Sequence, residues 1–128
     1  MAFKYRSLKS WKYQITEEYN YQTNISVTND IVTEFVHLAS DGKLLLKQYY
    51  AWDGASGGID TNNILRASLV HDGLCQLIEL GKLSLDHRKA SDKIFKEICL
   101  EDGMSKFRAN YIYLAIRAYV KVRYGAKY

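Results

Sequence analysis

The spacing of apolar residues changes near the middle of this 128-residue chain. Up to about residue 52, tyrosine, isoleucine, valine and threonine are frequent and partly alternate with polar residues, as in WKYQITEEYNYQTNISV, which is typical of half-buried strands. After about residue 62, apolar residues recur every three or four positions, which is typical of amphipathic helices. Strands followed by helices predict an α+β fold, in which a small antiparallel sheet of hairpins precedes three antiparallel helices.

The turn residues predict where these elements begin and end. A hairpin is expected over residues 31–52 with its turn at Ser40–Lys43, because the Asp-Gly pair inside that turn accepts positive φ. Asp60 or Thr61 is the expected N-cap of the first helix. The three helices are expected at about 62–80, 86–100 and 105–122. The expected organisation is one domain over residues 1–128, with a β-rich part to about 52, a glycine-rich loop at 53–61 and the helices over 62–125.

The composition excludes several classes of protein. No apolar run approaches the roughly 20 residues of a membrane span, and the basic start of the chain lacks the apolar core of a signal peptide. Cys75 and Cys99 fit a reducing compartment as small buried residues, and no cysteine-histidine cluster predicts a zinc site. We therefore expect an intracellular protein.

The end of the chain is basic. Between residues 104 and 128 there are six Lys or Arg residues and no acid, within a net charge of +4. Such a segment can contact the phosphates of lipid head groups or of nucleic acid, and the alternative is a helix face that only water covers. The tyrosines of this segment stand at helical spacing, which is more typical of a core than of base stacking, so nucleic acid is not an expected partner.

Two ionisable residues interrupt the apolar pattern of the first expected helix. His71 lies on the apolar stripe, and its buried imidazole needs hydrogen-bond partners. Asp72 is rotated by about 100° from it, so the two side chains face different surroundings. An antiparallel neighbour would place Asp92 opposite His71, where a carboxylate would fix the imidazole tautomer and leave the other nitrogen free to accept a proton from water. The alternative is a buried polar network that only stabilises the helix pair.

A glycine-rich stretch, WDGASGG, precedes this helix. Glycines let backbone carbonyl oxygens converge, and hard cations such as calcium prefer carbonyl and carboxylate oxygens. Asp72 would supply a carboxylate to such a site. Loop, His-Asp helix and second Asp helix together predict a calcium-dependent ester hydrolase.

The chain also resembles a small domain family of unknown function found in tailed phages and prophages. The matching motifs are DGAS at 53–56, HDGLCQL from His71, RKASDKIF from Arg88, DGM at 102–104 and YLAIR ending at Arg117, so the resemblance covers roughly residues 44–125. The resemblance implies that this is a phage protein made in the host cytoplasm. Its incorporation in the virion is left open. Other phage particle proteins, including further copies of the chain in a homo-oligomer, are the implied partners.

A more distant resemblance is to the core site of phospholipase A2, where a glycine-rich calcium loop precedes a His-Asp helix and an Asp on the next helix supports the histidine. It implies that His71 is the catalytic base and that Asp92 orients it. Asp72 would bind calcium, and the loop would complete the cation site with Asp53, Gly54 and Ser56.

Two functions therefore remain open. The first is calcium-dependent hydrolysis of lipid esters, with the basic last helix available to lipid head groups. The second is a non-catalytic head or tail accessory protein of the virion.

Overall fold

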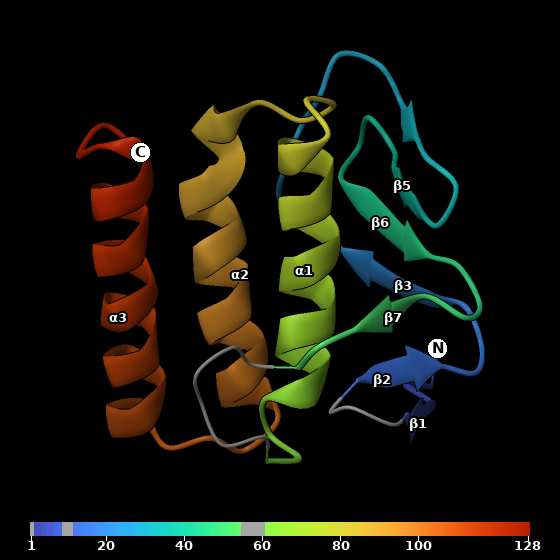
Figure 1. Cartoon of the computed structure of the whole chain (residues 1–128), viewed down its shortest axis with the longest axis horizontal. Coiled ribbons are helices and arrows are strands. Elements are labelled where there is room, and N and C mark those ends of the chain that lie inside the picture. Colours follow the sequence, from blue (N-terminus) through green and yellow to red (C-terminus); the bar gives the residue numbers. More distant parts are fainter. Residues whose placement is uncertain (1, 9–11, 55–60) are drawn as a thin grey trace.

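Seven short strands precede three helices in the computed structural model, which describes residues 2–8, 12–54 and 61–128 (Figure 1). This is the α+β fold that the sequence predicts. The strands are β1 (Tyr5–Ser7), β2 (Tyr13–Ile15), β3 (Tyr19–Gln22), β4 (Ile31–Val32), β5 (Val36–Leu38), β6 (Lys43–Leu46) and β7 (Ala51–Trp52). The helices are α1 (Leu65–Glu79), the short 3-10 helix η2 (Leu85–His87), α2 (Arg88–Glu101) and α3 (Lys106–Tyr124).

The strands form two antiparallel sheets, where the sequence predicts one. The first has the order β1-β2-β7, and the second has the order β3-β6-β5-β4. Each arm of the expected hairpin is divided into two strands. The first arm turns at Thr33, whose hydroxyl and amide both bond to Val36. The second arm passes from one sheet to the other at Tyr49, which has a φ of 75°.

The turn between β5 and β6 is where the sequence predicts it. Gly42 has a φ of 97°, and its carbonyl accepts hydrogen bonds from the amide and the hydroxyl of Thr23. A Cβ at this position would lie 2.6 Å from the carbonyl oxygens of Thr23 and Ile25. Only glycine therefore fits here without movement of the backbone, since both the φ value and the space exclude a side chain.

The helices follow the sequence prediction with shifted ends. Helix α1 begins three residues later than expected, with Ile64 at its N-cap position and no side-chain cap; Thr61 is therefore not the N-cap, and Asp60 lies outside the described residues. Ser84 caps η2, and α2 continues directly from it. Ser105 caps α3 by accepting a hydrogen bond from the amide of Arg108.

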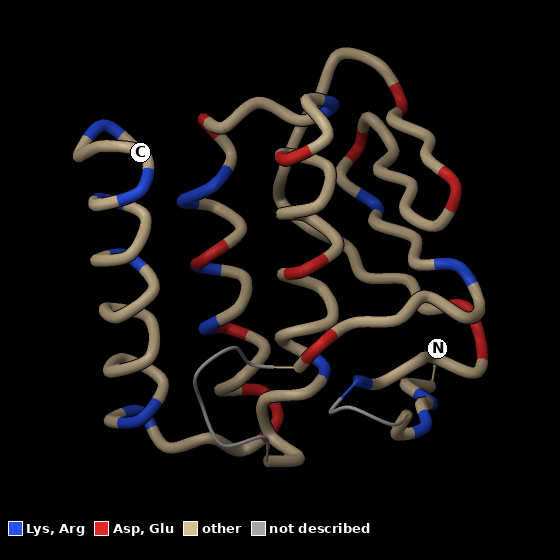
Figure 2. The backbone as a smooth tube through the Cα atoms, viewed as in Figure 1, with Lys and Arg blue, Asp and Glu red and all other residues tan. Residues whose placement is uncertain are grey.

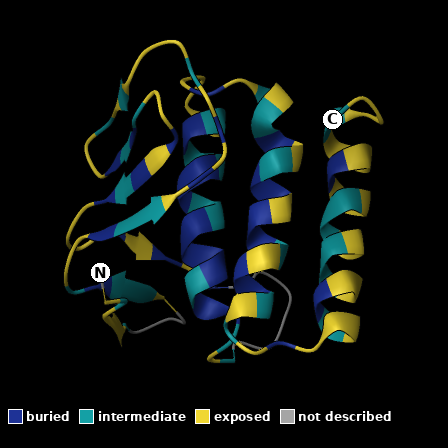
Figure 3. Ribbon diagram, turned by 180° about the vertical axis from the view of Figure 1, so that it is seen from behind, coloured by how far each residue is buried: buried dark blue, intermediate teal, exposed yellow. Residues whose placement is uncertain are grey.

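The three helices stand in one row beside the sheets, with α1 next to the strands and α3 at the far end (Figure 1). The position of each helix in this row determines how many of its residues are buried (Figure 3). In α1, eight residues are buried, because strands cover one side and α2 the other. Gly73 of α1 lets Leu46 of β6 approach so closely that a Cβ would lie 2.7 Å from the leucine side chain. In α3, only Ala109 and Val120 are buried.

None of the helices in the described parts of the chain combines the length and the apolar character needed to cross a bilayer.

Candidate functional site

His71 and Asp92 meet between α1 and α2, as the antiparallel packing of these helices predicts. The Nε2 atom of His71 lies 2.6 Å from Oδ1 of Asp92. The ring of Phe95 stands edge-on to the imidazole, with ring centroids 5.4 Å apart. The side chain of His71 is 12% exposed and that of Asp92 is fully buried. The imidazole is thus held at one nitrogen and reaches the surface only in part.

Two arginines hold the same carboxylate. Nε of Arg88, four residues earlier on α2, lies 2.9 Å from Oδ1, and Nη1 of Arg117 on α3 lies 2.6 Å from Oδ2. Arg117 also donates a hydrogen bond to the carbonyl of Tyr128. One buried carboxylate therefore connects all three helices and the residues that follow α3.

These partners determine the charge of Asp92. Burial by itself would raise the pKa of the carboxyl group, since it disfavours the charged form. The hydrogen bond from His71 and the ion pair with Arg88 outweigh burial, so the pKa of Asp92 is lowered. Asp92 is therefore an anion at neutral pH and a hydrogen-bond acceptor for the imidazole.

Cys75 lies one helical turn after His71. Its sulfur is 3.7 Å from Nε2 and 3.8 Å from Nδ1. At these distances the thiol can form only a long, weak hydrogen bond with the imidazole, and which nitrogen takes part depends on the tautomer. Burial raises the pKa of the Cys75 thiol to about 12, and the thiol is neutral at physiological pH.

Asp72 faces the strands, away from Asp92. Burial, and then the nearby charges of Asp53 and Glu79, together raise the pKa of Asp72 to about 7, against the opposing effect of Arg88. The buried phenol of Tyr50 lies close enough for mutual repulsion: burial and then Asp72 raise the pKa of Tyr50. None of the hydrogen bonds between described residues reaches the carboxylate of Asp72.

This environment partly fits the calcium site expected from the sequence. A divalent cation would relieve the repulsion between the carboxylates of Asp72 and Asp53, and both offer the hard oxygen ligands that calcium prefers. Gly54 is buried with a φ of 79°, and Ser56 lies outside the described residues. Within residues 2–8, 12–54 and 61–128, no three His, Cys, Asp or Glu side chains come together as a metal site. Among the described residues, backbone oxygens are the remaining candidates for further ligands.

The end of β7 positions Asp53 and Gly54. Just before them, the indole of Trp52 donates a hydrogen bond of 2.9 Å to the hydroxyl of Ser68 on α1. This bond fixes the first residues of the loop against the helix that carries His71 and Asp72.

The spacing of apolar residues does not indicate that Arg88, Arg117 and Tyr50 belong to this site. The spacing of Arg88 and Asp92 by four residues on one helix was an available signal, because such residues are neighbours on a helix surface. Arg117 lies in the YLAIR motif, but no local pattern assigns its side chain to Asp92. Tyr50 approaches Asp72 only because β7 crosses to the first sheet.

One family of known sequences matches the segment that carries this site. The match covers residues 59–116, and the family is described as a protein of unknown function (DUF1353). It includes His71, Asp72, Arg88 and Asp92 and stops one residue before Arg117. No curated protein and no solved structure gives a significant match. A family of unknown function is thus found for the helical part, and the expected phage and phospholipase relationships remain proposals.

A second polar network joins the ends of α1 and α2. The guanidinium of Arg66 forms hydrogen bonds with both carboxylate oxygens of Asp102, with Glu101 and with the hydroxyl of Tyr19. Glu101 is more than half exposed, and Arg66 and Asp102 are partly buried. This network fastens β3 to the helices and contains no imidazole or thiol that could act as base or nucleophile.

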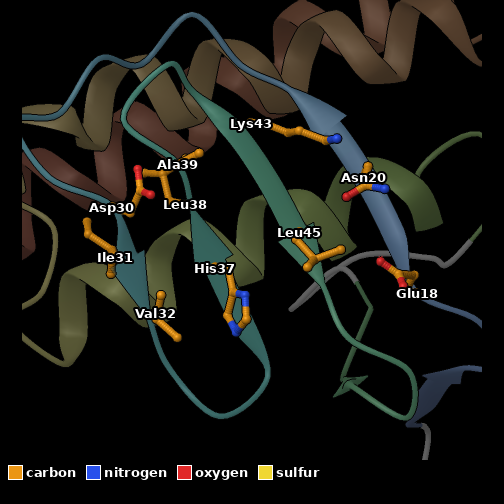
Figure 4. A pocket seen from close by; sticks show the side chains of 10 residues that line it. All are labelled: Glu18, Asn20, Asp30, Ile31, Val32, His37, Leu38, Ala39, Lys43 and Leu45. Carbon is orange, nitrogen blue, oxygen red and sulfur yellow. The ribbon is translucent and has the colours of Figure 1, made fainter.

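A hollow of about 330 Å³ lies on the four-stranded sheet, away from these residues (Figure 4). His37 of β5 and Val32 of β4 lie side by side at one end, and Glu18 and Asn20 line the opposite edge. His37 is a half-buried residue of a strand face, as the sequence predicts. Of the predicted site residues that the structure describes, none lines this hollow.

Proposed function

We propose that this chain is a phage-encoded protein whose His71 is the general base of a calcium-dependent lipid ester hydrolase. The observation that carries the proposal is the 2.6 Å contact between Nε2 of His71 and the buried, anionic Asp92. Arg88 and Arg117 support it by fixing both oxygens of that carboxylate. An imidazole oriented by a carboxylate is the usual arrangement for removing a proton from water or from a hydroxyl group.

The contact with Asp92 favours the tautomer that carries its proton on Nε2. The lone pair then lies on Nδ1, where the neutral thiol of Cys75 at 3.8 Å is a weak donor that a water molecule could replace. In the proposed reaction Nδ1 accepts a proton from water while the water oxygen attacks the ester carbonyl carbon. The proton then passes to the departing alcohol oxygen, and Asp92 stabilises the imidazolium in the interval.

Asp72 and Asp53 are the side chains proposed to hold calcium. A bound calcium ion would polarise the ester carbonyl and stabilise the negative charge that develops on its oxygen. The raised pKa of Asp72 supports this role, because an uncompensated carboxylate in a half-buried place is a favourable ligand for a cation. Above pH 7 the carboxyl group is ionised and available for binding.

The experiment measures release of a labelled fatty acid from phospholipid vesicles by the purified chain, with calcium or with a chelator. His71→Gln should reduce the rate by about 100-fold or more, the usual contribution of a general base. His37→Gln is the matched control, because His37 is a half-buried histidine on a distant strand. Asp72→Asn should abolish the dependence on calcium.

An unchanged rate in His71→Gln, or no hydrolysis by the unaltered chain, would refute the catalytic proposal. In the first case the imidazole would not take part in the reaction. In the second case the chain would have no lipase activity for the variants to test.

The second candidate function is a non-catalytic head or tail accessory of the virion. It is favoured by the completeness of the network: in the described part of the chain, every fully buried side-chain nitrogen and oxygen has a hydrogen-bond partner. In this case Asp92 connects the three helices and His71 is one of its donors. Mass spectrometry of purified particles tests this function, and absence of the chain from every preparation would exclude it.

A further inference from the structure

The outer face of α3 is apolar and has no partner in the described chain. Phe107 and Val122 are 83% and 88% exposed, and Tyr111, Leu114 and Tyr119 are each more than half exposed. At 3.6 residues per turn these five side chains fall on one stripe, opposite the buried Ala109 and Val120. We call these five residues the α3 stripe. A stripe of this kind on a surface marks a place where something binds.

The charges around the stripe indicate what binds. Residues 104–128 hold six Lys or Arg and no acid. Figure 2 shows α3 with basic residues at several turns and none that are acidic. By helical position, Lys121 lies beside the stripe, and Lys106 and Arg123 lie further round the helix; all three residues are exposed.

A second copy of the chain is a poor fit for this face. An isologous contact through two α3 stripes would bring the basic flanks of both helices together, and like charges at close range oppose association. The α3 stripe and the basic residues around it require a partner with an apolar interior and a negatively charged outer layer. Anionic lipid membranes have this construction, and helices with an apolar face, aromatic residues and basic flanks lie in their interface.

We propose that α3 docks this protein on anionic lipid surfaces, with the α3 stripe in the acyl boundary, Lys121 at the phosphates beside it, and the net positive charge of the segment attracting the chain to the surface. Binding requires no reaction at His71, which lies on α1 and faces α2. The docking proposal therefore stands or fails separately from the proposed hydrolase. If both hold, docking brings the chain to its substrate.

The test is sedimentation of the full chain with vesicles of phosphatidylcholine alone or with phosphatidylglycerol added, using His71→Gln as background so that hydrolysis cannot alter the vesicles. We expect binding to the anionic vesicles only, and weaker binding at high salt because ions screen the phosphates. Val122→Ser should weaken binding by roughly tenfold through loss of buried apolar surface. Lys121→Glu should weaken it by about tenfold or more, since each basic residue near such a surface contributes appreciably.

Matched controls come from the sheet side of the molecule. Val32→Ser removes the same side chain from another exposed position, and Lys47→Glu makes the same charge change in an exposed loop. Circular dichroism checks that all four variants fold. The proposal is overturned if no binding to anionic vesicles is seen, or if the α3 variants bind as the controls do. It is also overturned if the unaltered chain sediments as a dimer that Val122→Ser dissociates, because a second copy would then cover the stripe.

Discussion

Replacing Asp72 by asparagine should stabilise the protein at and above neutral pH. Burial, and then the charges of Asp53 and Glu79, raise the pKa of Asp72 from its ordinary value of 3.8 to about 7. In the unfolded chain the group loses its proton near pH 4, but in the folded chain it keeps the proton until about pH 7. The folded state therefore becomes less stable as the pH rises through this window, and the loss is complete above pH 7.

The size of the effect follows from the same values. The two pKa values differ by about three pH units, and each unit corresponds to about 1.36 kcal/mol, so the upper limit is about 4 kcal/mol. Asp72 is only half-buried, and water reduces the penalty, so about 2 kcal/mol is the expected gain for Asp72→Asn at pH 8. Asparagine is neutral at every pH, so the two proteins should have nearly equal stability at pH 4.

Urea unfolding at pH 4, 6 and 8 measures this difference. A gain of 2 kcal/mol raises the unfolding midpoint by about 1 M. Asp53→Asn should give a smaller gain, because it removes one neighbouring charge and leaves the burial of Asp72 unchanged. Asp86→Asn is the matched control, since it removes a carboxylate that is exposed on the surface near η2.

Equal midpoints for Asp72→Asn and the unaltered chain at pH 8 would refute the reasoning, and so would a gain that is the same at pH 4 and pH 8. Calcium provides a further check at pH 8. If Asp72 holds the ion, calcium should stabilise the unaltered chain and leave Asp72→Asn unchanged.

Four further substitutions test other parts of the structure by urea unfolding. Asp92→Asn should cost about 3–5 kcal/mol at pH 7, because it leaves buried charges without their partner, and the cost should shrink as the pH falls below 3.8, where the carboxyl group of the unfolded chain takes up a proton while the lowered pKa keeps the folded one charged. Gly42→Ala should cost more than 2 kcal/mol and Gly81→Ala only about 1 kcal/mol; both have positive φ, but a Cβ meets carbonyl oxygens at the first position and open space at the second, so equal costs would contradict the packing argument. Gly73→Ala should cost about 1–3 kcal/mol by displacing Leu46, and a neutral result would show that the core adapts there.

Local signals were sufficient to predict the helices. The hydroxyl of Ser105 caps α3 where the sequence places the start of a helix, and Gly81 and Gly103 follow α1 and α2 with positive φ. The contact between His71 and Asp92 was also predictable, because it follows from two apolar stripes on antiparallel neighbours. The start of α1 was not, because Ile64 begins this helix without any side-chain cap.

Features that depend on distant segments were not predictable. The division of the strands into two sheets depends on the turn at Tyr49, a residue that rarely adopts positive φ. Tyr111 and Tyr119 are exposed, although their helical spacing is typical of a core, because α3 ends the row and α2 is the helix that packs beside it. The pairing of Arg117 with Asp92 needs α3 packed against α2, which no short pattern contains.

Because α3 stands at the end of the row, its detachment from α2 should cost less free energy than the opening of α1 or α2. Few of its residues lie in the core, so detachment exposes little new apolar surface. Native-state hydrogen exchange should therefore be fastest in the amides of α3 and slowest in those of α1. Breaking the link between Arg117 and Asp92 would release α3 first, while the sheets and α1 stay together. Of the three helices, proteases that sample partly opened molecules would cut α3 first.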